Sequence, residues 1–191
     1  MNLIGILMIG IGLSMDAFAV AVCKGLGMKR YRNKYAFITG LYFGVFQGMM
    51  PLIGFLLGFK FKDYIESIDH WIAFILLGLI GLNMIKEAVK EDSCVVYPES
   101  EEAFTFKAML PLAVATSIDA LAVGITFAFL KVAIIPAVII IGITTFTLSV
   151  AGVKIGNVFG SRFKKKAEIS GGVILILIGL KILLEHLGII G

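Results

Sequence analysis

The sequence is built from apolar segments long enough to cross a lipid bilayer, separated by short polar stretches. A helix needs about 20 predominantly apolar residues to span the hydrocarbon core of a membrane. Hydrophobic residues make up 59% of the 191-residue chain, charged residues only 16%, and the mean hydropathy is +1.01. Soluble domains carry about a quarter charged residues. The composition therefore excludes a soluble globular protein.

Six segments have the length and composition of transmembrane helices. We expect these helices at residues 3–23, 35–59, 70–89, 107–130, 132–159 and 170–190. No segment shows the alternation with period two that a membrane β-barrel requires. The first apolar run contains Asp16 and has no basic residue before it, so we expect it to remain as a helix and not to be cleaved as a signal peptide. The sequence predicts an all-α integral membrane protein.

Basic residues indicate how the chain is oriented in the membrane. Positions 24 to 34 contain five basic residues, including Lys24, and no acidic residue. Positions 162 to 166 contain four basic residues. Short cytoplasmic loops are enriched in Lys and Arg, so we expect the odd-numbered loops in the cytoplasm and both termini outside. The net charge of +4 then reflects orientation and not nucleic-acid binding. Cys23 and Cys94 fall on the cytoplasmic side, where we expect reduced thiols.

The chain contains an internal repeat. Residues 14–20 read SMDAFAV and residues 117–123 read SIDALAV; Gly54 and Gly58 match Gly152 and Gly156; and residues 81–87 resemble residues 179–185. Three matches in the same order indicate two homologous halves of three helices each. Because three is odd, the second half enters the bilayer from the opposite face, which makes an inverted-topology repeat typical of transporters. We expect the first repeat at 1–90, an acidic cytoplasmic linker at 91–106 and the second repeat at 107–191.

Asp16 and Asp119 are the only carboxylates well inside the predicted spans, and the repeat places them at equivalent positions. A charged residue at the centre of a transmembrane helix costs at least about 2.5–3.5 kcal/mol. A single buried aspartate can be a protonated structural residue, but a matched pair favours a functional site. Small residues surround both, so we expect both to face the interior of the bundle. Two converging carboxylates predict a cation site near the midplane.

The residue types near the two aspartates favour a hard divalent cation. Carboxylate, hydroxyl, amide and carbonyl oxygens suit Mg²⁺, Ca²⁺ or Mn²⁺, whereas Zn²⁺ and Cu⁺ favour Cys or His. The Met15 thioether would suit Mn²⁺ better than Mg²⁺, although packing is the commoner role of a membrane methionine. The accessory ligands that we consider are Met15, Ser14, Ser117, Thr116 and Gln47, with Asn83, Thr144, Thr145 and Thr147 as further oxygen donors.

Other polar and small residues have less specific interpretations. Glu168 could act as a gate or proton-relay group, but a solvated interfacial role is more frequent for such a residue, and we interpret Asn157 in the same way. Glycines spaced by four residues are typical of close helix packing. They occur at positions 40, 44 and 48 and at positions 152, 156 and 160.

Three stretches resemble the MntP family of manganese efflux pumps: SMDAFAV at 14–20, SIDALAV at 117–123 and KKAEISGG at 165–172. The resemblance covers nearly the whole chain. It implies a Mn²⁺ exporter of a prokaryotic plasma membrane, related to the lysine exporters, with Asp16 and Asp119 as the transport carboxylates and Glu168 in the matching motif of the sixth helix. The acidic third loop is longer than a tight connection needs, and we expect a solvated linker there rather than a metal-collecting site.

The sequence also limits the mechanism. It has no phosphate-binding G-x-x-x-x-G-K-[ST] motif and no constellation of nucleophile and base in its spans, so we expect neither an enzyme nor a cofactor. Export of a divalent cation against an inside-negative potential requires coupling, and inward proton movement is the natural candidate. Alternatives are export of another divalent cation or of a cationic amino acid, or a passive cation channel. The expected partners are the lipid bilayer, the cation and protons, with no nucleic acid.

Overall fold

The structure, a computed structural model, describes residues 3–61, 74–75, 78–80, 82, 85–86, 101–159, 169, 173, 176–177, 180 and 183–184. All regular structure in these residues is helical. Its elements are α1 (Leu3–Leu26), α2 (Asn33–Phe61), the 3₁₀ helix η2 (Glu101–Phe104), α4 (Phe106–Thr116), α5 (Ile118–Phe129) and α6 (Ile134–Phe159). The predicted first, second and fifth spans are confirmed as helices. Most of the third and sixth spans lies outside the described residues.

Helices α1, α2 and α6 are each long and apolar enough to cross a membrane, and α4 with α5 adds a fourth candidate if the bent pair forms one span. Large apolar side chains on these helices are exposed, Leu41 by 47% and Ile143 by 61% among them. Such exposure on apolar helices marks a surface that meets lipid and not water. The described part of the chain is therefore an α-helical membrane protein.

The predicted fourth span is broken at Ser117. The expectation of one continuous helix over 107–130 is wrong, because α4 ends at Thr116, α5 begins at Ile118, and the two axes differ by 43°. Ser117 has a non-helical backbone conformation, with φ −113° and ψ 8°. Its hydroxyl donates to the carbonyl oxygens of Ala113 and Val114, a local bond that competes with helix geometry and often bends helices.

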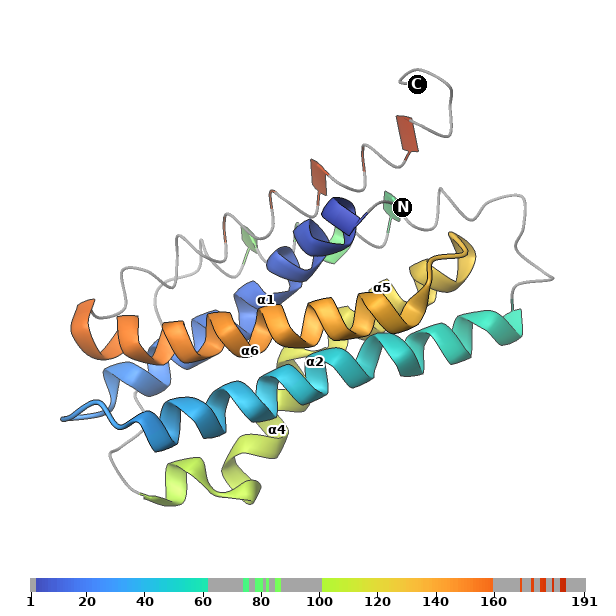
Figure 1. The fold of residues 1–191 in the computed structure, drawn as a ribbon. Coiled ribbons are helices and arrows are strands. Elements are labelled where there is room, and N and C mark those ends of the chain that lie inside the picture. The colour runs from blue at the N-terminus through green and yellow to red at the C-terminus, as the bar shows by residue number, and fades with distance from the viewer. Residues whose placement is uncertain are drawn as a thin grey trace.

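Helices α2 and α6 lie side by side, with α1 against α6 and α5 against α2 (Figure 1). The first crossing is made by Gly44 and Gly142. A Cβ added to Gly44 would lie 2.9 Å from the Gly142 carbonyl oxygen, and one added to Gly142 would lie 3.1 Å from the Gly44 carbonyl oxygen. The backbones thus meet directly, as the predicted glycine packing requires.

The other two helix pairs also meet through glycines. Gly54 of α2 lies on Leu121 and Gly58 lies on Ile125, both in α5. In the same pair, Gly124 of α5 lies on Pro51 of α2. In the second pair, Gly152 and Gly156 of α6 lie on α1. The α1 residues under Gly152 and Gly156 are Phe18 and Val22. The register that matches Asp16 with Asp119 also matches Phe18 with Leu121 and Val22 with Ile125, so equivalent glycines contact equivalent residues.

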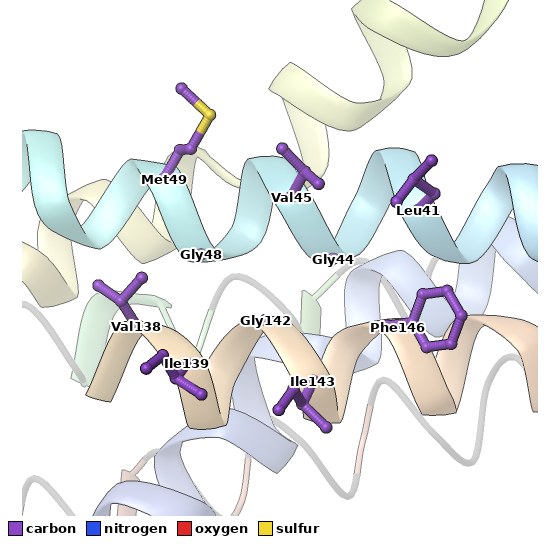
Figure 2. A pocket seen from close by; sticks show the side chains of 10 residues that line it. All are labelled: Leu41, Gly44, Val45, Gly48, Met49, Val138, Ile139, Gly142, Ile143 and Phe146. Carbon is purple, nitrogen blue, oxygen red and sulfur yellow. The ribbon is translucent and has the colours of Figure 1, made fainter. Parts of the chain in front are cut away.

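An apolar groove of about 380 Å³ runs along the outer side of the α2–α6 crossing. Figure 2 shows it between the two helices, with Gly44, Gly48 and Gly142 at its floor. The described residues that line it are all apolar or glycine. The larger side chains along its edges are Leu41, Val45, Met49, Ile139, Ile143 and Phe146.

Lys24 is buried and not in a solvated loop. Helix α1 continues to Leu26, three residues beyond the predicted end of the first span, and Lys24 within it is 1% exposed. Its Nζ donates to the Ala103 carbonyl oxygen and lies 5.1 Å from the centre of the Phe104 ring. Phe104 stacks on Tyr35, with ring centres 4.4 Å apart. The predicted linker at 91–106 therefore ends in a packed segment, since Ala103 and Phe104 are both buried.

Two further expectations at this end of the bundle are wrong. Asn157 is not simply solvated: its Nδ2 donates to the carbonyl oxygens of Gly25 (3.3 Å) and Met28 (2.7 Å), which follow the last turns of α1. Such bonds satisfy carbonyl groups that a helix end leaves without partners. Cys23, for which a reduced thiol is expected, is disulfide-bonded.

Replacement of Gly54 or Gly156 by valine tests the glycine contacts. A Cβ at either position would overlap a backbone carbonyl oxygen, of Leu121 or Val22 respectively, so each variant should lose about 1–3 kcal/mol of stability or more. The measurement is thermal unfolding of the purified protein in detergent. Gly10→Ala is the control, because its Cβ would meet Ile141 at an ordinary 3.5 Å. Equal melting temperatures for all three variants would contradict the close backbone contacts of Gly54 and Gly156.

Candidate cation site

Asp16 and Asp119 come from different helices and lie near one another. Asp16 is half-buried on α1, and Asp119 lies in the first turn of α5, directly after the break at Ser117. The two carboxyl groups are within electrostatic range, so their negative charges repel each other when both are ionised. Asp119 Oδ1 accepts a hydrogen bond of 2.8 Å from the backbone N–H of Ala120, whereas its buried Oδ2 has no hydrogen-bond partner.

Gln47 of α2 joins this pair. Its side chain is fully buried and lies beside the Asp119 carboxylate. The Gln47 Nε2 donates to the Leu13 carbonyl oxygen of α1 over 3.1 Å, while Oε1 is buried with no hydrogen-bond partner. Two buried acceptor oxygens, Oδ2 of Asp119 and Oε1 of Gln47, are thus left without a donor. Buried acceptors in this state are costly unless a proton, a water or a cation satisfies them.

Ser14 of α1, in the motif whose sequence matches residues 117–123, meets Thr145 of α6. Their hydroxyl oxygens are 2.7 Å apart and both side chains are buried. The registers of the repeat that match Ser14 with Ser117 and Gly152 with Gly54 also match Thr145 with Gln47. The two aspartates are therefore accompanied by one hydroxyl pair and one amide.

The remaining candidates are placed less favourably. Thr116 is buried and its hydroxyl donates to the Ala113 carbonyl oxygen. Met15 is buried in an apolar cluster with Leu13 and Phe18, which is consistent with packing. Thr147 is exposed, and its hydroxyl donates to the Ile143 carbonyl oxygen. Thr144 is half-buried. Glu168 and Asn83 lie outside the described residues.

The structure adds two polar residues that the sequence analysis did not single out. Thr39 of α2 and Ser149 of α6 are both fully buried, and neither hydroxyl has a hydrogen-bond partner. Thr39 precedes Gln47 by eight residues and Ser149 follows Thr145 by four, so each lies on the face of its helix that carries the site residue. This helical spacing is the sequence signal that points to Thr39 and Ser149.

The arrangement limits how a metal could be held. Within the described ranges, no group of three or more His, Cys, Asp or Glu side chains gathers. Among the described residues, the further ligands available to a cation at Asp16 and Asp119 are therefore neutral oxygens. Such a donor set suits hard or borderline divalent ions and disfavours ions that need thiolate or imidazole.

Helices of membrane-spanning length around a pair of intramembrane carboxylates define this chain as an α-helical integral membrane protein with the features of a transporter. Residues 30–183 match the family described as "Putative manganese efflux pump". The chain belongs to this manganese efflux pump family.

Proteins named "Putative manganese efflux pump MntP" are similar to the chain over nearly its full length. That of Desulfitobacterium hafniense is 65% identical and the match covers 96% of this chain and 95% of that protein. That of Acetivibrio thermocellus is 61% identical, with 100% of this chain and 94% of that protein covered. No solved structure matches the chain.

Asp119→Asn should stabilise the metal-free protein. The change removes the repulsion between two neighbouring carboxylates and the burial of an unsatisfied carboxylate oxygen. We expect the melting temperature in detergent with chelator to rise by about 2–4 °C, which corresponds to ~1 kcal/mol in a chain of this size. Asp119→Glu keeps the charge and should not be stabilised. A lower melting temperature for Asp119→Asn than for the wild type would show that the carboxylate is a structural requirement.

Proposed function

We propose that this chain exports Mn²⁺ from the cytoplasm through a site formed by Asp16 and Asp119. The observation that carries the proposal is the approach of these two carboxylates from matched motifs in separate helices. Membership of the manganese efflux pump family supports Mn²⁺ as the ion. Gln47 is the best-placed accessory ligand, because its buried Oε1 has no hydrogen-bond partner, and an amide oxygen suits Mn²⁺.

The site would lie at the interface of two inverted three-helix repeats, residues 1–90 and 107–191. The glycine contacts support this arrangement: α2 meets α5 at Gly54 and Leu121, and α6 meets α1 at the equivalent Gly152 and Phe18. The Gly44–Gly142 contact would lie close to the pseudo-twofold axis, because the register of the repeat matches these two residues with each other. Inverted repeats of this kind place substrate sites near the bilayer midplane.

The protein would reside in a prokaryotic plasma membrane with both termini outside. The basic residues between positions 24 and 34 support a cytoplasmic first loop. In this orientation the ends of α1 and α6 joined by Asn157, and the packed segment at Phe104, lie on the cytoplasmic side. Mn²⁺ would enter from that side.

Export has to be coupled to another gradient. Moving Mn²⁺ outward costs about 4.6 kcal/mol per 100 mV of inside-negative potential, before any concentration difference. Inward proton movement can supply this free energy, because each carboxylate holds either a proton or part of the metal's coordination shell. Asp16 and Asp119 would release Mn²⁺ to the outside as they gain protons and would lose the protons to the cytoplasm. Repulsion between two bare carboxylates favours binding of either protons or Mn²⁺.

The bent span gives the cycle a structural basis. The α4–α5 pair is broken at Ser117, next to Asp119, whereas α1 runs unbroken past the equivalent Ser14. The two halves therefore have different shapes although their motifs match. Exchange of these shapes would open the site alternately to each side, which is how inverted repeats produce alternating access.

Everted membrane vesicles test export and coupling together. With an acidic lumen, vesicles that contain the protein should accumulate Mn²⁺, and a protonophore should abolish the accumulation. Asp16→Asn and Asp119→Asn should each reduce the initial rate at least about tenfold, a loss of ~1.4 kcal/mol.

Each outcome has a separate meaning. Accumulation that survives the protonophore would reject proton coupling but not export. Wild-type rates in both asparagine variants would reject the site. Lys131→Gln serves as the control, because Lys131 is exposed in the turn between α5 and α6, and its rate should equal that of the wild type.

A further inference from the structure

Thr39 and Ser149 differ from most other serine and threonine residues of the described helices. The usual state of a serine or threonine in a membrane helix is a hydrogen bond to the carbonyl four residues earlier. Neither Thr39 Oγ1 nor Ser149 Oγ has any partner, and both are fully buried. The residues that do make this bond are Ser14, Ser117, Thr126, Thr145 and Thr147.

The two hydroxyl residues lie at one level of the α2–α6 interface. A Cβ on Gly40 would contact Val150 and Phe146, and Thr39 and Ser149 directly precede Gly40 and Val150 in the sequence. Leu41 and Val45 of α2 face the outer groove (Figure 2). Thr39, one residue before the glycine row, lies on the opposite side of that row, towards the bundle interior, in agreement with its complete burial.

Among the described residues, no group hydrogen-bonds to either hydroxyl. The buried cluster at this end of the bundle consists of apolar side chains, several of them small, including Ala17, Ala21, Ala36 and Val153. Phe43 lies between Thr39 and Gln47 on the same face of α2 and is fully buried. Thr39 precedes Gln47 by eight residues, or about 12 Å of helix rise. The hydroxyl pair is thus displaced from the aspartates towards the start of α2.

We propose that Thr39 and Ser149 form a transit site for the partly hydrated divalent cation between the cytoplasm and the aspartate pair. The inference rests on the proposed export function and on its orientation, in which the start of α2 is cytoplasmic. Two neutral hydroxyls can accept hydrogen bonds from the ion's water shell or bind the ion directly. Without a carboxylate they hold it weakly, and conduction requires sites that release the ion as readily as they bind it.

The proposal predicts that loss of the two hydroxyls changes the rate of transport but not the affinity of the Asp16–Asp119 site. Removal of both hydroxyls raises the barrier for entry but leaves Asp16, Asp119 and Gln47 unchanged. The double variant Thr39→Val/Ser149→Ala should therefore transport Mn²⁺ about tenfold more slowly, the effect of ~1.4 kcal/mol in the barrier. Its equilibrium affinity for Mn²⁺ should remain that of the wild type.

The experiment uses full-length protein in proteoliposomes with Mn²⁺ supplied on the cytoplasmic face. Initial rates are measured by a lumenal Mn²⁺-quenched dye, and affinity is measured by electron paramagnetic resonance of free Mn²⁺ in detergent. Thr147→Val is the matched control, because it lies on the same helix with an exposed, bonded hydroxyl. Thr39→Ser in the presence of native Ser149 retains the hydroxyl and should keep the wild-type rate. Melting temperatures identify any variant that fails to fold, and in that case Thr39→Ala and Ser149→Ala are compared singly.

The outcomes distinguish the two proposals. A slow double variant with unchanged affinity supports the transit site. A double variant as fast as Thr147→Val overturns it and leaves the hydroxyls as binders of static water. A parallel loss of rate and affinity also overturns it, because the hydroxyls would then belong to the main site. Absence of Mn²⁺ transport by the wild type would instead reject the export function.

Discussion

The direct contact of α2 and α6 at Gly44 and Gly142 determines where the polar side chains of these helices can meet. With no side chain between them, each backbone lies against the other's carbonyl oxygen. Residues on the inner side of the glycine rows, Gln47 and Thr145, are then held against α1 and near the two aspartates. Residues on the outer side line an apolar groove. One close approach thus separates a lipid-facing surface from a polar interior.

The polar interior has two parts that differ in their hydrogen bonding. Around Ser14 and Thr145 the hydroxyls bond to each other and to their own helices. Around Asp119 and Gln47, two acceptor oxygens remain unpaired, and the span is broken at Ser117. The two matched sequence motifs therefore differ in hydrogen bonding and in backbone shape. The proposed alternating access would need such a difference, because two identical halves in identical shapes give only one arrangement.

Sequence alone predicted the helical class, three of the spans and the close packing of the glycines, and it singled out Asp16, Asp119 and Gln47, which the structure places near one another. These follow from hydropathy, spacing and the match of residues 14–20 with residues 117–123. It did not predict the break at Ser117, because equivalent Ser14 has the same i−4 bond in an unbroken helix. Nor did it predict the burial of Lys24, which depends on the distant Ala103 and Phe104. The spacing of Thr39 and Ser149 from Gln47 and Thr145 places them on the same helix faces, but only three-dimensional packing shows that their hydroxyls lack partners.

Pro51, which packs under Gly124, has a consequence for the chemistry of α2. A proline within a helix has no N–H to donate to the carbonyl four residues earlier, and four residues before Pro51 stands Gln47. The main-chain oxygen of Gln47 is thus released from the helical ladder in the same residue whose side-chain oxygen is unpaired. One residue can therefore offer two uncharged oxygens to a cation, and the missing backbone bond also gives α2 a natural point of flexure at the depth where the ion would be exchanged.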